Sequence, residues 1–152
     1  MDAYDTINDI LVNLFNEILK LEEEAIITDE FKNMTNNDMH IIEAIGLGED
    51  RTMSAVAKKL GITAGSLTTS VNSLVNKKYV ERRRSEVDRR VVYVMLTPKG
   101  VRAYEHHREY HRKMTEAVLN VLDEEELPIL IKTLNSLSEF FREYSAEQPT
   151  TV

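Results

Sequence analysis

The stretch AVAKKLGITAGSLTTSVNSLVNKKYVERRR, residues 55–84, decides the fold of this chain. A short segment with helical periodicity ends at Gly61, and a second one starts after Thr63, a residue type that commonly caps helix N-termini. Apolar residues recur at helical spacing on the second segment: Leu67, Val71, Leu74 and Val75. The stretch therefore predicts a helix-turn-helix whose second helix packs on the core.

The opposite face of that second helix carries small, hydroxyl or amide side chains and no acid: Gly65, Ser66, Thr69, Asn72, Ser73 and Asn76. Such side chains approach base edges and phosphates without steric cost or repulsion, as a helix in the major groove must. A Ser/Thr-rich solvent face is the alternative interpretation. The coincidence of turn, cap, apolar face and a following hairpin favours DNA binding.

A hairpin follows directly in SEVDRRVVYVMLTPKG, residues 85–100. Strands are predicted at 79–84 and 91–97, and a hairpin beside a recognition helix is a wing. Arg89 and Arg90 at its tip are placed to enter the neighbouring minor groove, whose negative potential favours a guanidinium. We expect Asp88 to pair with one of them and hold the tip in shape, whereas an ordinary solvated turn is the alternative.

The charge is divided unevenly along the chain. Residues 51–100 carry a net +8, whereas the whole chain carries −7, so that the remainder carries −15. This asymmetry indicates either a polyanion-binding module in an acidic frame or a solvated basic face.

The remaining segments predict helices at 5–27, after the cap Thr35, at 52–60, from Pro98 to about residue 122 and from Asp123 to about residue 144. The expected fold class is mainly α with a small two- or three-stranded β-wing, a winged helix-turn-helix with long N- and C-terminal dimerisation helices. The expected division has four parts, which together form one intertwined unit: an N-terminal dimerisation helix at 1–30, the DNA-binding domain at 31–100, C-terminal dimerisation helices at 101–145 and a disordered tail at 146–152. The terminal helices are too apolar for a central module to cover, which favours a homodimer over an intramolecular core.

The order of elements and the segment DRRVVYVMLTPKG, residues 88–100, are recognisable: an Asp-x-Arg is followed by a strand and by Leu-Thr-x-x-Gly. Across essentially its whole length the chain resembles the MarR family of bacterial regulators. Within that family, residues 66–97 look most like the repressors of fatty-acid biosynthesis genes in low-GC Gram-positive bacteria. The resemblance implies a homodimeric repressor on a pseudo-palindromic operator, with long-chain acyl-acyl carrier protein as co-repressor and no other required cofactor.

We expect individual residues to make different contacts with double-stranded DNA. The major groove is expected to be read or contacted by Gly65, Ser66, Thr68, Thr69 and Asn72, with Thr63 as the cap. The wing residues that serve the backbone and minor groove are Arg84, Arg89 and Arg90, with Asp88 in support. Further phosphate contacts are expected from Lys58, Lys59 and Lys77.

The histidines offer an alternative function. His107 and His111 are four residues apart, so they share one helical face, a spacing suited to a shared metal, and Glu22 could add an oxygen ligand. Zinc-sensing MarR members use one glutamate and three histidines in these regions, and Glu22, His40, His107 and His111 lie at matching places. The resemblance thus also implies a zinc-responsive repressor, or else an acid–imidazole network beneath a ligand pocket.

Other classes of protein are disfavoured. No nucleophile motif, phosphate-binding glycine loop or paired carboxylates point to an enzyme. No apolar run approaches the roughly 18 residues of a membrane span, and the acidic N-terminus lacks the features of a signal peptide. The absence of cysteine fits a reducing compartment, so we expect a cytoplasmic protein without membrane contact. A winged helix that binds protein instead of DNA is a better alternative than an enzyme, but the net charge of +8 on residues 51–100 argues against it.

Overall fold

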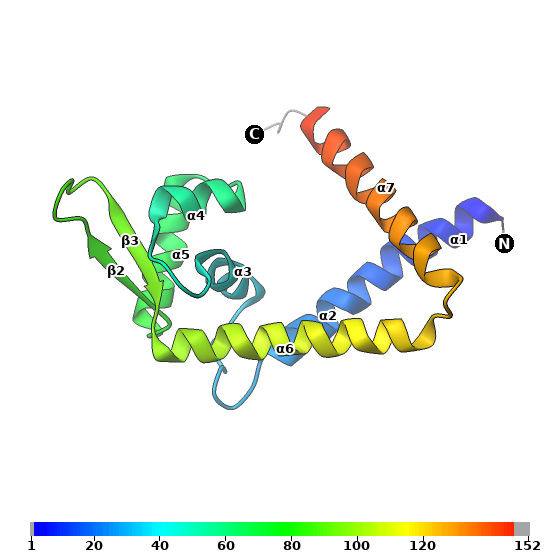
Figure 1. Ribbon diagram of the computed structural model, residues 1–152, viewed down its shortest axis with the longest axis horizontal. Helices are drawn as coiled ribbons and strands as arrows, with labels where there is room; N and C mark the ends of the chain where they lie inside the picture. The colour runs from blue at the N-terminus through cyan, green and yellow to red at the C-terminus, as the bar shows by residue number, and fades with distance from the viewer. Residues whose placement is uncertain (1, 148–152) are drawn as a thin grey trace. The chain divides into compact units, whose positions relative to one another are not determined.

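The computed structural model describes residues 2–147, which divide after Tyr110 into two compact units (Figure 1). The elements of the first unit, in chain order, are α1 (Ala3–Asp9), η1 (Ile10–Leu14), α2 (Phe15–Ile26), α3 (Asn36–Ile45), β1 (Arg51–Thr52), α4 (Met53–Leu60), α5 (Ala64–Asn76), β2 (Val80–Arg84) and β3 (Val92–Leu96). Helix α6 (Pro98–Val121) begins in the first unit and ends in the second, which also contains α7 (Glu126–Glu147). The expected fold class, mainly helical with a small β-wing, is confirmed.

The predicted N-terminal helix is one helical run in three parts. Asp2 caps it by accepting a hydrogen bond from the Asp5 amide at 2.9 Å, and η1 is a π-helical turn between α1 and α2. Large apolar side chains of this run are exposed within the chain: Ile7, Ile10, Val12, Leu14, Phe15, Leu19 and Leu21. The run thus has an apolar surface that its own unit does not cover.

Threonine caps fix the starts of the three short helices. Thr35 and Asp38 form a reciprocal capping box at α3, with both hydrogen bonds at 3.1 Å. Thr52 accepts from the Ala55 amide at the start of α4, and Thr63 does the same for the Ser66 amide at α5. The predicted helix starts are confirmed, because such caps depend on residues only three positions apart.

The wing is a three-stranded antiparallel sheet with the strand order β1-β3-β2. Val80 pairs with Leu96 and Arg84 with Val92, so β2 and β3 match along their whole length. The two strands predicted from the sequence are confirmed, and β1 adds a third strand of two residues on the far side of β3.

The hydrophobic core of the first unit lies between α3, α4, α5 and the sheet, and its fully buried side chains include Ile42, Val56, Leu67, Val71, Leu74, Tyr79 and Val94. Gly100 lets the start of α6 approach this core closely. A Cβ atom at Gly100 would lie 2.1 Å from the Tyr79 carbonyl oxygen, so no other residue type fits there without a shift.

Helix α7 follows a second capping box, in which Asp123 accepts from the Glu126 amide and Glu126 accepts from the Asp123 amide. Its exposed apolar side chains include Ile129, Ile131, Leu134, Phe140 and Phe141. The tail predicted at 146–152 begins inside this helix, because α7 continues to Glu147, and residues 148–152 lie outside the described residues. The division into 1–30, 31–100 and 101–145 stays a prediction.

Candidate nucleic-acid interface

The outward face of α5 is polar, exposed and free of acids. All five residues predicted to contact the major groove, Gly65, Ser66, Thr68, Thr69 and Asn72, are exposed. The hydroxyls of Thr68 and Thr69 donate to the carbonyls of Ala64 and Gly65, at 2.8 and 3.2 Å. Because these hydroxyls donate within the helix, they are left as hydrogen-bond acceptors for an external partner. The positive end of the helix dipole favours a phosphate near the start of α5.

The wing tip is held by hydrogen bonds from two short polar side chains. Ser85 Oγ accepts from the amides of Val87 and Asp88, at 3.2 and 3.3 Å. Asp88 Oδ1 accepts from the Arg90 amide at 3.0 Å and lies 3.4 Å from Arg90 Nε. The expected pairing of Asp88 with a tip arginine is confirmed for Arg90, whose side chain is still 94% exposed.

A groove of about 560 Å³ separates α5 from the wing. Its basic lining residues are Arg82, Arg84 and Arg90, and Thr68 of α5 also lines it. Any DNA strand that passes between a helix in the major groove and a wing tip in the minor groove must cross this groove. Three guanidinium groups are thus available there for its phosphates.

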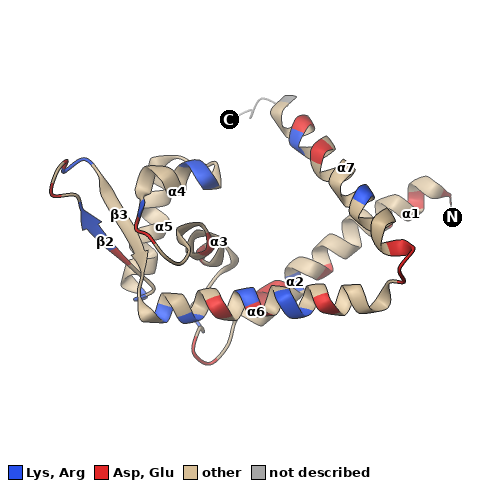
Figure 2. Cartoon of the chain, in the orientation of Figure 1, with Lys and Arg blue, Asp and Glu red and all other residues tan. Residues whose placement is uncertain are grey.

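Figure 2 shows that β2 is basic toward the wing tip. The strand begins with Val80 and Glu81 and ends with Arg82, Arg83 and Arg84. Arg83 differs from its neighbours: it forms an ion pair with Asp50 at 2.7 Å and lies 5.4 Å from the centre of the Tyr93 ring. The strand alternation therefore separates Arg83, which packs within the wing, from Arg82 and Arg84, which line the groove toward α5.

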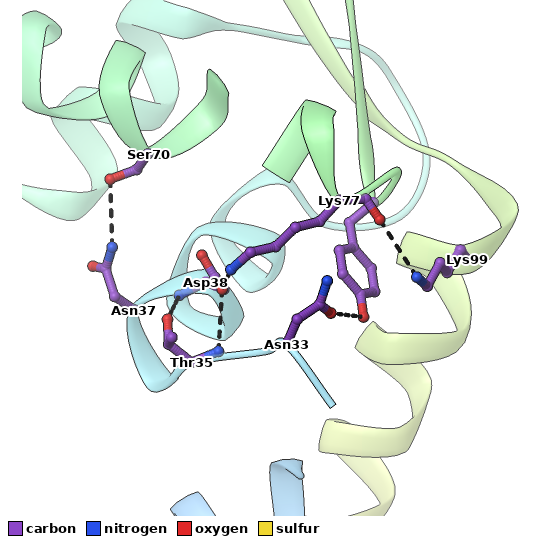
Figure 3. A network of polar contacts seen from close by, with 8 residues as sticks. Asn33, Thr35, Asn37, Asp38, Ser70, Lys77 and Lys99 are labelled. Carbon is purple, nitrogen blue, oxygen red and sulfur yellow. Dashed lines mark hydrogen bonds and ion pairs between the residues drawn. The ribbon is translucent and has the colours of Figure 1, made fainter. Parts of the chain in front are cut away.

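Two polar contacts with α3 hold α5 in place, one with a buried carboxylate and one at the surface (Figure 3). Lys77 Nζ, just after α5, lies 2.8 Å from Oδ2 of the buried Asp38 of α3. Asn37 of α3 donates to Ser70 Oγ of α5 at 3.4 Å. The recognition helix is thereby tied to the start of α3 at two points one turn or more apart.

Tyr79 continues this network toward α6. Its hydroxyl donates to Asn33 Oδ1 at 3.2 Å, and Lys99 Nζ lies 4.4 Å from the centre of its ring (Figure 3). Burial raises the pKa of the Tyr79 phenol above its ordinary value, and the nearby carboxylates of Asp38 and Glu30 add to this shift.

The predicted lysine contacts divide into two groups. Lys58 and Lys59 are exposed near the end of α4, where a phosphate could reach them. Lys77 instead holds Asp38, and its side chain is 23% exposed. The structure thus gives Lys77 a partner inside the protein that charge counting along the sequence did not reveal.

The predicted metal residues come together only in part. His107 is buried in α6, and its Nε2 lies 3.4 Å from Glu22 Oε1 of α2 and 3.0 Å from Glu43 Oε1 of α3. Glu43 was not predicted. His40 is exposed on α3 and lines a separate shallow groove with Glu43 and Lys59, while His111 lies one turn after His107 on α6.

The donor set can hold a cation. Two carboxylate oxygens lie near the imidazole nitrogen Nε2 of His107, and zinc accepts both of these ligand types. The same atoms also form an acid–imidazole cluster without metal, in which His107 Nε2 donates to a carboxylate when it carries a proton. This cluster connects α2, α3 and α6, so it links the N-terminal helix to the DNA-binding elements.

Comparison with known proteins agrees with this geometry. Residues 32–91, which span the helix-turn-helix and most of the hairpin, match the MarR family. The chain is similar to Streptococcus pneumoniae FabT, as seen in its crystal structure in complex with DNA, with 40% sequence identity. The match covers 93% of this chain and 99% of FabT, and the two structures superpose with a TM-score of 0.86. The chain belongs to the MarR family.

Two further relatives share less of the sequence. The HTH-type transcriptional regulator PchR of Bacillus subtilis is 26% identical over 125 residues, which are 80% of this chain and 73% of PchR. The Staphylococcus aureus MepR–DNA complex shares the fold at 21% identity, with a TM-score of 0.65 over 88% of this chain and 97% of that one. The chain is thus a DNA-binding transcriptional regulator of the MarR type and not an enzyme, as the sequence predicts. Among the described residues, no helix combines the length and apolarity needed to cross a lipid bilayer.

Proposed function

We propose that this MarR-type regulator represses genes of fatty-acid biosynthesis. The observation that carries the proposal is the 40% identity to FabT along almost the whole of both chains. It is supported by the exposed hydroxyl and amide face of α5 and by the arginine-bearing wing tip, which suit the major and minor grooves of one operator half-site. The individual contacts of residues 63–72 and 84–90 with DNA belong to this proposal.

The regulator acts as a homodimer on a pseudo-palindromic operator. Two observations support the dimer: the apolar side chains of α1, η1 and α2 are exposed within the first unit, and so are those of α7 within the second. Apolar surface of this extent is typical of an interface between subunits. Two copies related by a two-fold axis would present their recognition helices to successive major grooves, about 34 Å apart.

Long-chain acyl-acyl carrier protein serves as the co-repressor, and the regulator works in the cytoplasm. The acyl form binds the DNA-competent arrangement of the dimer more tightly than the other arrangement, and so increases its population. No further cofactor is required.

The test combines isolation and DNA binding. Native mass spectrometry of the protein from its host is expected to show a dimer that carries acyl carrier protein or an acyl chain. In a gel-shift titration, long-chain acyl-acyl carrier protein should lower the Kd for duplexes from promoters of fatty-acid genes, whereas acyl-free carrier protein should not. An unchanged Kd with both forms would refute the lipid-sensing proposal, and a solitary chain at micromolar concentration would refute the dimer.

A zinc-responsive repressor is the second candidate. It is favoured by the buried His107, which lies between the carboxylates of Glu22 and Glu43. Zinc titration followed by calorimetry is the test: His107→Ala and Glu43→Gln should lose binding, whereas His40→Ala should retain it because His40 is exposed outside the cluster. Stoichiometric zinc in protein from the host would support this candidate, and no zinc binding by the unaltered chain would exclude it.

A further inference from the structure

Lys78 has a backbone conformation that suits glycine better than lysine. It lies in the turn between α5 and β2 with φ at 71°, and it is the one non-glycine residue with positive φ among those described. Its amide donates to the Val75 carbonyl at 3.0 Å and its carbonyl accepts from Thr97 Oγ1 at 2.6 Å. The backbone contacts of the turn thus impose this conformation, whereas the lysine side chain contributes nothing to it and adds steric strain.

The side chain of Lys78 lines a basic groove of about 670 Å³ between the end of α5, β2 and the start of α6. The charged residues that line it are Lys78, Arg82, Lys99, Arg102 and one acid, Glu81. Arg102 is paired with Glu30 at 2.6 Å, and Lys99 lies over the Tyr79 ring. Within the described part of the chain, Lys78 and Arg82 have no ion-pair partner, so their charges are available to an external anion.

This groove shares a lining residue with the groove beside α5. Arg82 lines both: on one side it lies with Lys78 and Val75, and on the other with Thr68, Arg84 and Arg90. Exposed cations of β2 and of the turn before it therefore lie beside both the first turns and the end of α5. A DNA strand that crosses between α5 and the wing would leave this space along the same line of charges.

We propose that Lys78 and Arg82 form a phosphate track that holds the DNA backbone beside each operator half-site. The inference depends on the proposed placement of α5 and the wing tip on DNA. DNA is favoured over an acidic protein because Arg82 is shared with the groove between α5 and the wing. The track adds affinity without reading bases, since ammonium and guanidinium groups contact phosphates of any sequence. This charge gives lysine a function at a position whose φ favours glycine.

Lys78→Gly separates binding from folding. Glycine adopts the observed φ without strain, so the variant should unfold at the same temperature as the parent chain or a higher one. It should nevertheless bind the operator more weakly, by about 3- to 10-fold at low salt, and the slope of log K against log salt should fall by about 0.9 for each phosphate that the variant no longer neutralises. A variant that merely damaged the fold would lower both the unfolding temperature and the affinity.

Three further variants complete the experiment. Arg82→Gln should reproduce the weaker binding and the smaller salt slope, and Lys32→Gln, which removes an exposed charge outside both grooves, should not. The decreases in affinity from Lys78→Gly and Arg82→Gln should be equal for operator and scrambled duplexes, whereas Asn72→Ala should weaken the operator more than the scrambled duplex.

Two results would overturn the track. If Lys78→Gly and Arg82→Gln bind duplex DNA as Lys32→Gln does while the parent chain binds its operator, the track is wrong and the proposed function stands. If an acidic protein then binds the parent chain but not these two variants, the groove is a protein-binding site instead. If the parent chain binds no duplex at any salt concentration, the proposed function fails and the track fails with it.

Discussion

The ion pair between Lys77 and Asp38 makes a quantitative prediction about stability. The two charges are 2.8 Å apart, and their side chains are 23% and 6% exposed. Lys77→Met keeps the apolar stem but leaves the Asp38 carboxylate buried, with the Thr35 amide at 3.1 Å as its remaining donor. Removal of one partner from a buried pair costs about 3–5 kcal/mol, and because the Thr35 hydrogen bond persists we expect about 2–3 kcal/mol here.

A double-mutant cycle in urea, at one fixed protein concentration, measures this coupling. Asp38→Asn retains an acceptor for the Thr35 amide but removes the charge, so the Asp38→Asn/Lys77→Met variant should be more stable than Lys77→Met alone, by at least about 1 kcal/mol. The control is Lys20→Met, whose pair with Glu24 at 3.9 Å is 75% and 62% exposed and should contribute at most about 0.5 kcal/mol. A Lys77→Met variant as stable as the control, or a double variant with purely additive effects, would refute the reasoning.

Three further predictions concern packing, pH and the wing. Gly100→Ala should lower the free energy of unfolding by at least about 2 kcal/mol, because the new methyl group meets the Tyr79 carbonyl; Gly65→Ala, in open space on α5, should raise it by about 0.5–1 kcal/mol. The pKa of Tyr79 is raised in the folded chain, so the folded state holds the phenol proton more tightly than the unfolded state. The free energy of unfolding should therefore decline as the pH rises above about 10, the ordinary pKa of tyrosine. Urea unfolding curves measured across this range should show a smaller decline for Tyr79→Phe. Arg90→Ala should weaken operator binding by at least about 1 kcal/mol with a smaller salt slope in gel shifts, and an unchanged affinity and slope would exclude Arg90 from the interface.

The sequence predicted those features of the fold that depend on neighbouring residues. The caps at Thr35 and Thr63 and the left-handed turn at Gly61 involve residues at most four positions apart, and each lies where the pattern indicates. The expected fold class allowed a third strand, but its place was not predicted. The two residues of β1 cannot display an alternating pattern, and they are a strand only through pairing with residues 93 and 94. The approach of Gly100 to Tyr79 was likewise visible only in the folded chain.

In the candidate sites too, contacts between neighbouring residues could be predicted and contacts between distant residues could not. Asp88 and Arg90 are two residues apart, so their pairing follows from the local sequence. Lys77 meets Asp38 across 39 positions, and a count of basic residues could not separate it from exposed lysines such as Lys59. Around His107, the sequence selected His40 of α3, whereas Glu43 makes the contact; these two lie about one helical turn apart, and only the packing of α3 on α6 decides which of them reaches His107.

In the proposed complex with DNA, ionic attraction and base recognition come from different elements. Helix α5 has no acid or base between Ala64 and Asn76, so it contributes hydrogen-bonding groups and the dipole of its N-terminus but no ionic attraction. The cations are instead carried by β2, the wing tip and the end of α4, while contacts with α3 hold α5 in place. Phosphate contacts determine affinity and its dependence on salt, whereas base contacts determine sequence preference. Substitutions on β2 should therefore change the Kd for all duplexes together, and substitutions on the outer face of α5 should change the ratio between operator and non-operator DNA.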